Sequence, residues 1–147
     1  MSARKVLVVA AVLLGYSSGA QTDAKHSSSK KTGEVFYGTA SFYSNKFDGR
    51  ETANGDVFHQ EGMTAACNRI ALNNFVKVIN ERNKRVVVVK VTDRMHPNNK
   101  RLIDLSRAAA KKLGYTGSGL TKVKVEVLGK EAPKGWQSFE ERASSQN

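Results

Sequence analysis

The stretch VKVTDRMHPNNKRLIDLS, residues Val89–Ser106, carries the strongest information about the fold. It begins within the apolar run RVVVVKVTD (residues 85–93), continues through a polar loop and ends where a helix is expected to begin. A continuous apolar run bounded by turn residues is typical of a strand buried on both sides. The polar side chains that follow fit a catalytic cleft, a metal site or a tight connection, and the candidates are Asp93, Arg94, His96 and Asp104.

The neighbouring segments predict further strands and one helix. Strand-like patterns cover residues 34–44, 75–80 and 120–129, and Gly38 inside the first suggests a bend or a bulge. The sequence SRAAAKKLG predicts a short helix with Ser106 as its N-cap and Gly114 just past its last turn. Strands joined by uneven connections, together with one short helix, favour a mainly β protein built as a small closed barrel.

Residues 1–20 predict a cleavable signal peptide. A basic start leads into the apolar run Val6–Leu14, which is short for a membrane span, and small residues stand at Ser18 and Ala20. We therefore expect a periplasmic or secreted protein with no transmembrane anchor after cleavage, and an uncleaved anchor is the alternative. No cysteine follows the apolar run, so we expect no lipoprotein.

The rest of the chain is predicted to hold one domain between two polar segments. Residues 21–33 are rich in Ser and Lys and predict a flexible linker, residues 34–129 form the domain, and residues 130–147 predict a flexible tail. Docking of Trp136 and Phe139 on the domain is the alternative for the tail.

The charge of the chain favours a polyanionic partner. Loss of Arg4 and Lys5 with the signal peptide lowers the formal net charge from +11 to +9. For an exported protein this favours a cell-wall polymer or a membrane surface before nucleic acid, and a merely solubilising charge is the alternative. The sequence has no P-loop, no Cys/His metal framework and no RNA-stacking motif, so we expect a monomer without cofactor, metal or nucleic acid.

Four motifs in sequence order resemble the rare lipoprotein A family. They are GTASFYSNKFDGRETANGDVF (38–58), MTAACNRIAL (63–72), VKVTDR (89–94) and RLIDLSRAAAKKLG (101–114). The resemblance implies a six-stranded double-psi β-barrel with one or two short helices. It also implies endolytic peptidoglycan lytic transglycosylation of glycan strands without stem peptides. Expansins share this barrel, so a non-catalytic module that binds cell-wall glycan is the alternative.

The resemblance implies three cleft positions, which are occupied here by Asp56, Cys67 and Asp93. Asp56 follows ANG, where the family usually has Glu, and a simple turn residue is the alternative. Asp93 ends the apolar strand and could serve in proton transfer, or it could pair with Arg94 to lock the loop.

Cys67 departs from the family pattern, which has a histidine at the end of TAAH. A neutral thiol cannot replace imidazole as a proton carrier. It could instead be a core residue or a nucleophile, although no Cys–His–Asn pattern supports the second. His96 could compensate for the lost histidine from the loop, or it could be a surface residue.

The remaining candidates are an acid and three possible sugar contacts. Asp104 resembles an essential acid of the expansin branch, and the alternative is a structural carboxylate at the entrance of a helix. Thr39, Tyr43 and Tyr115 are candidates for sugar binding, although aromatic residues in a small barrel often belong to the core. We expect Asp93 and Asp56 to transfer protons, with Asp104 in support.

Overall fold

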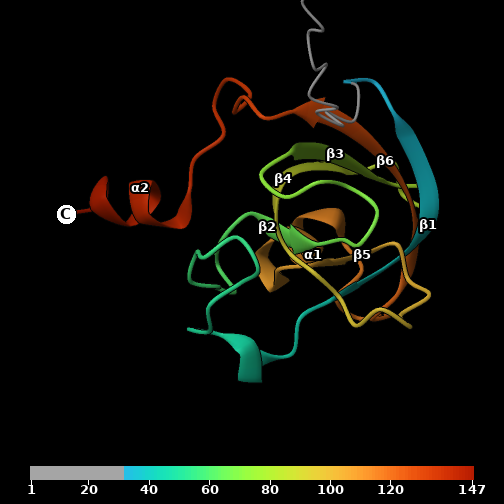
Figure 1. Ribbon diagram of the computed structural model, residues 1–147, viewed down its shortest axis with the longest axis horizontal. Helices are drawn as coiled ribbons and strands as arrows, with labels where there is room; N and C mark the ends of the chain where they lie inside the picture. The colour runs from blue at the N-terminus through green and yellow to red at the C-terminus, as the bar shows by residue number, and fades with distance from the viewer. Residues whose placement is uncertain (1–31) are drawn as a thin grey trace, which may run out of the picture.

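A computed structural model describes residues 32–147, in which six strands close into a barrel (Figure 1). Around the barrel the order is β1-β5-β2-β4-β3-β6, with parallel pairing of β1 to β5 and of β2 to β4 and antiparallel pairing elsewhere. This confirms the predicted closed six-stranded barrel. The strands are β1 (Val35–Phe42), β2 (Thr64–Ala66), β3 (Phe75–Asn80), β4 (Val86–Asp93), β5 (Ile103–Leu105) and β6 (Thr121–Gly129).

The four long strands are the ones that the sequence pattern predicts, within two residues at their ends. The two short ones, β2 and β5, have three residues each, which is too short for a period of two to be read from the sequence. Both are fixed by their neighbours, because β2 pairs with β4 and β5, and β5 also pairs with β1. Pairing between distant segments therefore decides these two elements.

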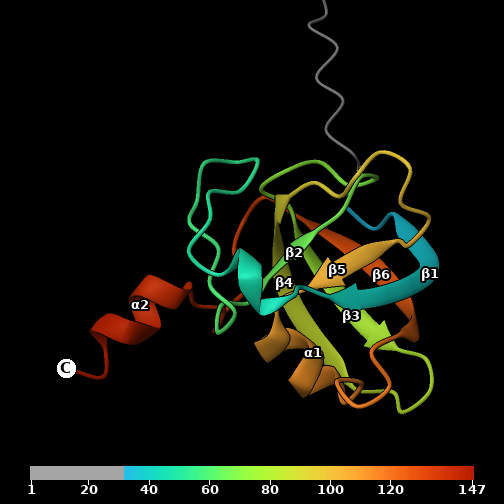
Figure 2. The same cartoon turned by 90° about the horizontal axis from the view of Figure 1, so that it is seen from below.

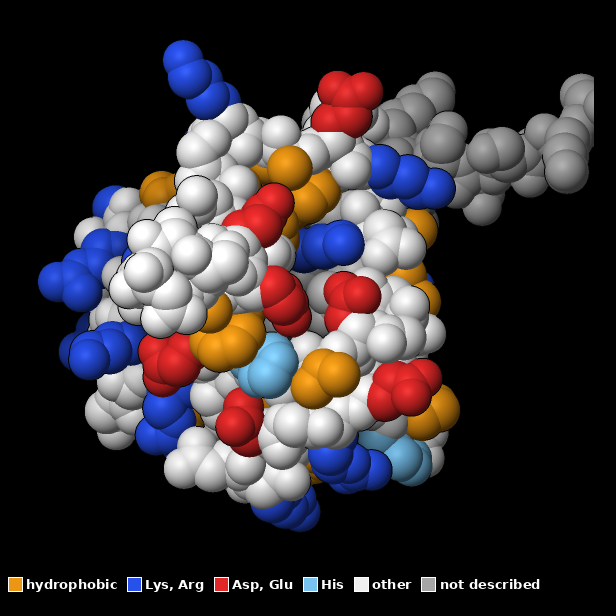
Figure 3. Space-filling view, turned by 90° about the vertical axis from the view of Figure 1, so that its left-hand side faces the viewer, with side chains coloured by type: hydrophobic (Ala, Val, Ile, Leu, Met, Phe, Trp, Pro, Cys, Tyr) orange, Lys and Arg blue, Asp and Glu red, His pale blue; other side chains and the backbone are white. Residues whose placement is uncertain are grey.

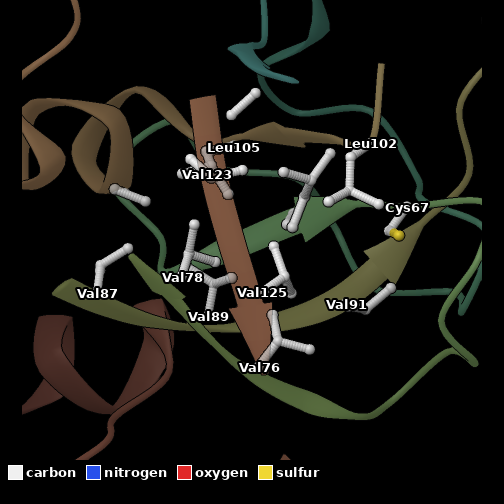
Figure 4. Packing of buried hydrophobic residues seen from close by; sticks show 14 of the residues in the cluster. Cys67, Val76, Val78, Val87, Val89, Val91, Leu102, Leu105, Val123 and Val125 are labelled. Atoms are coloured by element: carbon white, nitrogen blue, oxygen red, sulfur yellow. The ribbon is translucent and has the colours of Figure 1, made fainter. Parts of the chain in front are cut away.

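The core is filled mainly by valines from β3, β4 and β6 (Figure 4). Burying a valine side chain stabilises the fold by about 1.5–3 kcal/mol relative to leaving it in water. β4 differs from the prediction of a strand buried on both sides. Val87 and Val89 are buried, whereas Val86 is exposed and Val88 and Lys90 are half-buried, because only one side of the strand faces the interior of the barrel.

Gly38 serves a different purpose from the predicted bend or bulge. It pairs with Val123 in a continuous register between β1 and β6. A Cβ atom at this position would lie 2.6 Å from the Cβ of Leu102. Glycine is therefore required because the loop before β5 passes close over β1.

The helix α1 (Arg107–Leu113) covers one end of the barrel, opposite the loop that follows β4 (Figure 2). The Ser106 side chain accepts a hydrogen bond of 3.3 Å from the Ala109 N–H, and Gly114 ends the helix in a left-handed conformation with φ of 76°. The predicted N-cap and C-terminal glycine are both confirmed. With α1 at one end, the opposite end is left for the loops that form a cleft.

The C-terminal segment contains a second helix, α2 (Phe139–Ser144), to one side of the barrel (Figure 1). Ser138 and Glu141 form a reciprocal capping box at its start. Trp136 packs edge-on against Phe75 at 4.8 Å between ring centroids, which is the docking given above as the alternative to a flexible tail. The aromatic contacts hold this segment on the barrel.

The signal-peptide prediction and most of the predicted linker lie outside the described residues. Within residues 32–147, the helices are too short and too polar to traverse a lipid bilayer.

Candidate functional site

A cleft of about 460 Å³ opens where β1, β2, β4 and β5 come together, and we call it the acid cleft. Its position follows from strand register, because Ala66 of β2 pairs with Asp93 of β4 on one side and with Asp104 of β5 on the other. The two acids are thus two strand spacings apart, about 10 Å between their backbones. The other residues that line the cleft include Phe42, Tyr43, Phe47, Arg94, His96 and Arg101.

Asp93 is held at the end of β4 by three hydrogen bonds. Its Oδ1 accepts from the Ala53 N–H at 3.0 Å and from the Arg94 N–H at 2.8 Å. Its Oδ2 accepts from the Tyr43 hydroxyl at 2.8 Å. A carboxylate offers about four acceptor sites, so Oδ2 keeps one lone pair that can receive a proton or contact a ligand.

Asp104 is bound by a different set of groups. The Ser41 hydroxyl donates to Oδ1 at 2.6 Å, while Arg101 donates from Nε to Oδ1 at 2.9 Å and from Nη2 to Oδ2 at 3.1 Å. This bidentate contact with the guanidinium fixes the plane of the carboxylate. The hydrogen bond to Asp104 is also the main reason that the pKa of Arg101 is raised. The arrangement differs from a helix cap, because Asp104 lies inside β5.

Tyr43 connects the acid cleft to an aromatic cluster. Its ring lies 4.2 Å from Phe58 and 5.8 Å from Phe47, measured between centroids. Burial, followed by the hydrogen bond to Asp93, raises the pKa of Tyr43 well above its ordinary value. The hydroxyl therefore keeps its proton and remains a donor to Asp93. Tyr43, which the sequence suggests as a sugar contact, therefore lines the cleft, but its hydroxyl already donates its proton to Asp93.

The other two predicted sugar contacts lie elsewhere. Tyr115 is buried with 3% exposure, and its hydroxyl donates to the Ser41 carbonyl at 2.7 Å, so it belongs to the core and cannot reach a ligand. Burial, followed by the negative charge of Asp104, raises the pKa of Tyr115. Thr39 lies on β1 outside the cleft, and its hydroxyl accepts a hydrogen bond from Lys122 at 2.9 Å.

Arg94 and His96 both line the acid cleft but differ in their contacts. Arg94 donates from Nη1 to the carbonyl oxygens of Cys67 and Ile70, the latter at 2.7 Å, so its side chain binds the loop after β2 and does not pair with Asp93. His96 is exposed, and its Nδ1 accepts from the Asn98 N–H at 3.2 Å.

Cys67 does not line the cleft, in contrast to the position that the resemblance implies. Its side chain is 0% exposed and lies at the edge of the core cluster near Val91 and Leu102 (Figure 4). Only its main chain serves the site, because the Cys67 N–H donates to the Asp93 carbonyl at 3.1 Å. The structure therefore supports the core interpretation over the nucleophile, since a buried thiol cannot reach a substrate.

Asp56 lies in a second hollow, on the side of the molecule that carries α2. Figure 3 looks onto this side and shows acidic side chains on both sides of the hollow, with a basic side chain and a histidine at its rim. The Asp56 carboxylate is exposed, accepts from Asn54 Nδ2 at 2.9 Å and lies 3.9 Å from Lys90 Nζ. The Ala53 N–H bond to Asp93 places this loop beside the acid cleft.

No group of three His, Cys, Asp or Glu side chains within residues 32–147 is placed to hold a metal ion. The polar groups of the acid cleft are suited to proton transfer and to contact with hydroxyl groups.

Sequence reasoning missed Arg101 and Ser41, which both bind Asp104. Arg101 stands three residues before Asp104, and a charge pair at that spacing could have been noticed. Ser41 could not, because it reaches Asp104 through the parallel pairing of β1 with the short strand β5.

Residues 35–125 match the family model described as lytic transglycolase. The chain is 42% identical over 113 residues to "Endolytic peptidoglycan transglycosylase RlpA" of Haemophilus influenzae, a match that covers 77% of this chain and 39% of that protein. It is 51% identical over 91 residues to the protein of the same name from Pseudomonas aeruginosa, covering 62% and 27%. The chain thus spans well under half the length of these relatives.

Among solved structures, the Streptomyces papain inhibitor aligns with a TM-score of 0.54 at 22% identity, over 66% of this chain and 96% of that one. An expansin of Clavibacter michiganensis aligns with a TM-score of 0.52 at 22% identity, over 68% and 53%. These likenesses concern the barrel fold. The match over residues 35–125 and the relative from Haemophilus influenzae show that the chain belongs to the lytic transglycolase family of RlpA-like double-psi β-barrels.

Proposed function

We propose that this protein is a peptidoglycan lytic transglycosylase that acts on glycan strands without stem peptides and remodels the cell wall. The observation that carries the proposal is the acid cleft, in which Asp93 is fixed by three hydrogen bonds and faces Asp104 across Ala66. The relatives from Haemophilus influenzae and Pseudomonas aeruginosa bear the name of this activity. Because the chain matches only a part of each, the activity remains a proposal here.

The reaction needs one group that first gives and then takes a proton. The bond between the anomeric carbon of N-acetylmuramic acid and the glycosidic oxygen breaks, and Asp93 protonates the leaving oxygen from Oδ2. The C6 hydroxyl of the same sugar then bonds to the anomeric carbon, and its proton passes to Asp93. The product is a 1,6-anhydro sugar, no water is consumed and the acid is regenerated.

Asp104 is assigned an electrostatic role. Its carboxylate is fixed by Arg101 and Ser41, so it keeps one orientation as a substrate enters. A fixed negative charge stabilises the positive charge that develops on the sugar ring as the glycosidic bond breaks. Asp56 is expected from the sequence to transfer protons beside Asp93, but it lines the neighbouring hollow and not the acid cleft, so we assign it instead to binding of the glycan strand next to the point of cleavage.

His96 is assigned a secondary role in the cleft. Its exposed ring lines the same cleft as Asp93, and an imidazole can both donate and accept a hydrogen bond. We expect the pH–rate profile of His96→Ala to differ from that of the parent protein. Identical profiles on purified glycan would remove His96 from the mechanism.

The site of action is proposed to be the periplasm or the cell exterior. This follows from the predicted signal peptide and from the substrate, since peptidoglycan lies outside the cytoplasmic membrane. We propose that the protein acts as a monomer.

The test is digestion of purified glycan strands from which stem peptides have been removed. The expected products carry 1,6-anhydro-N-acetylmuramic acid ends, which mass spectrometry identifies. Digests that contain no such ends, while the protein still binds the strands, would overturn the proposal.

A non-catalytic glycan-binding module is the second candidate. It is favoured by the burial of Cys67, because the core position supplies no proton carrier where the family pattern has histidine. The excess of basic residues would support salt-dependent binding to the wall. Pull-down on intact sacculi that weakens with salt and is unaffected by Asp93→Asn, without product formation by the parent, would favour this candidate.

A further inference from the structure

We infer that the end of the barrel that carries α1 is a docking surface for a membrane of anionic phospholipids. We call this surface the basic end. It is defined by Arg82, Lys84 and Arg85 in the turn between β3 and β4 and by Lys111 and Lys112 in the last turn of α1. It lies opposite the acid cleft, so docking there uses none of the residues to which the proposed activity assigns a role (Figure 2).

Direct contacts join the turn and the helix into one surface. Asn83 in the turn donates from Nδ2 to the carbonyl of Leu113, the last residue of α1, at 2.8 Å. The guanidinium of Arg85 lies against Gly114, since a Cβ atom at that glycine would be 2.8 Å from Nη1 of Arg85. The five cations come from two separate segments, and these contacts bring them to one end of the molecule.

The charge of the basic end is not neutralised within the protein. All five basic residues are exposed, and within residues 32–147 none of them forms an ion pair with a carboxylate. Glu81 is the only acid in the turn. Figure 3 shows basic side chains gathered along its left-hand margin, which is the α1 side of the molecule. Cations elsewhere on the barrel do pair with acids, and they are Lys77, Lys90, Arg101 and Lys124.

Two large apolar side chains are exposed among these charges. Val86 directly follows Arg85 and is 47% exposed, and Leu120 is 54% exposed. Leu120 is held beside the turn because its neighbour Thr121 donates a hydrogen bond of 3.0 Å to Oδ1 of Asn80, which ends β3. At the surface of an anionic bilayer, basic side chains bind headgroup phosphates and apolar ones reach the hydrocarbon boundary. A soluble phosphate polymer would use only the charges, so the combination favours a membrane.

A cavity of about 410 Å³ lies at the edge of the basic end, between α1, β4 and the C-terminal segment. Lys112, Lys134 and Arg142 line it, and no acid of residues 32–147 does. Val86 and Trp136 add apolar surface to its wall. Pockets for small ligands measure about 300–1,000 Å³. The cavity can therefore accept the phosphate headgroup of one lipid, with the apolar wall against its glycerol.

Docking through the basic end would leave the acid cleft uncovered. The helix α1 and the loop after β4 lie at opposite ends of the barrel (Figure 2). The carboxylates of Asp93 and Asp104 would then face away from the lipid surface, toward whatever lies beyond it. The membrane would thus hold the molecule in one orientation without blocking its cleft.

Binding to lipid vesicles of defined charge tests the inference. The full chain is sedimented with vesicles of phosphatidylcholine alone and with vesicles that also contain phosphatidylglycerol. Residues 6–14 are apolar and could bind to both, so the difference between the two vesicles measures the binding that depends on charge. We expect at least tenfold tighter binding to the charged vesicles, and a smaller preference at high ionic strength because salt screens the charges. No preference for the charged vesicles would overturn the inference.

Two matched triple variants show whether the basic end is responsible. The test variant loses three of its cations through Arg82→Gln, Lys84→Gln and Lys111→Gln. The control loses three exposed cations from loops outside the basic end through Arg50→Gln, Lys100→Gln and Lys130→Gln. One basic side chain near an anionic surface changes the affinity about fivefold. We therefore expect the test variant to bind charged vesicles at least tenfold more weakly than the control. Equal affinities would mean that net charge alone governs binding and would overturn the inference.

Leu120→Ser distinguishes a membrane from a phosphate polymer. Loss of the exposed apolar side chain should weaken binding to charged vesicles about fivefold and leave binding to soluble polyphosphate as in the parent. Tyr37→Ser, which alters an exposed residue of β1, is the control and should change neither. Unchanged vesicle binding by Leu120→Ser would overturn the assignment to a membrane and leave a phosphate polymer as the partner.

Thermal melting shows that each variant is folded before its affinity is compared. None of these measurements uses glycan, so failure of the proposed function gives a different result. In that case the parent protein makes no anhydro ends, yet it still prefers charged vesicles, and Asp93→Asn binds them as the parent does.

Discussion

The acid cleft and the tail-side hollow, which is the second hollow that Asp56 lines, lie side by side. They differ in how completely their polar groups are hydrogen-bonded within the protein. In the acid cleft the carboxylates of Asp93 and Asp104 are each bound by three hydrogen bonds from the protein. In the tail-side hollow two buried polar groups have no partner among the described residues. The first arrangement fixes the reacting groups before a substrate arrives, whereas the unpaired groups of the second lie below the surface and are out of reach of a ligand.

This difference agrees with the chemistry proposed for each region. A proton-transfer group must be held in one orientation, because misplacement of a reacting group lowers the rate steeply. A group that only helps to bind the strand, as proposed for the exposed Asp56 in the hollow, tolerates a looser arrangement. The cleft is made of residues within the family match, whereas five of the thirteen residues that line the hollow come after it.

The largest effect is expected for Asp93→Asn, which tests the catalytic side of the comparison. The amide keeps the shape of the side chain but cannot act as a general acid, so we expect product formation to fall by about 10²- to 10⁴-fold. The measurement is the initial rate of release of anhydromuramyl ends. Glu51→Gln, which neutralises an exposed acid outside the cleft, should keep the parent rate. A rate for Asp93→Asn within threefold of the parent would show that the cleft is not the catalytic site.

The next effect concerns Cys67 and tests whether its side chain behaves as a core residue or as a cleft residue. Cys67→Ser places a hydroxyl in an apolar site without a designed partner, so the free energy of unfolding should fall by about 1–3 kcal/mol. Urea unfolding measures this loss, and Cys67→Ala serves as the control without a polar atom. We expect the rate of product formation per folded molecule to stay the same in both variants. Selective loss of activity in the serine variant, with unchanged stability, would show that the Cys67 side chain takes part in the functional site.

A smaller effect is expected from Tyr43 at alkaline pH. Its pKa is raised in the folded protein, chiefly by burial and then by Asp93, above the value of 10.0 expected in the unfolded chain. The unfolded chain therefore loses this proton first as the pH rises past about 10, and the stability of the fold declines there by at most about 1.4 kcal/mol per pH unit. Below pH 10 the contribution of this group is fully present.

Tyr43→Phe should make this alkaline decline less steep, because one group that titrates differently in the two states is gone. Urea unfolding at pH 9, 10 and 11 measures the slope. The exposed Tyr37 provides the matched variant Tyr37→Phe, for which we expect the slope of the parent protein. An unchanged slope in Tyr43→Phe would mean that the pKa of Tyr43 is not raised in the folded protein, and would contradict its burial against Phe58 and its contact with Asp93.

The smallest effect is expected for Arg101→Gln. The Arg101 side chain is 41% exposed, and exposed ion pairs contribute about 0–1 kcal/mol. We expect a loss of that size in the free energy of unfolding, and a smaller loss at high salt because salt screens the pair. Thermal melts at low and high ionic strength measure it. A loss above about 2 kcal/mol would mean that Arg101 is integral to the fold and not only to the orientation of Asp104.

Much of the fold was predictable because the long strands and α1 carry local signals. The alternation in residues 120–129 and the caps Ser106 and Gly114 depend on neighbours in sequence, and the structure has these elements as expected. Asp93 and Asp104 were also found, since each follows or lies in a recognisable motif. The strands β2 and β5, with three residues each, depend on pairing with distant strands and carry little local signal.

Local periodicity, capping and motif order are enough to predict the four long strands, the α1 helix and the acids around the loop after β4. The burial of Cys67 and Tyr115 in the core and the position of Asp56 in the tail-side hollow are visible only in the folded chain. The packing of Trp136 and Phe139 against the barrel is likewise visible only there. The reason is physical: whether a side chain faces core, cleft or solvent depends on strand register and on contacts between segments far apart in the chain.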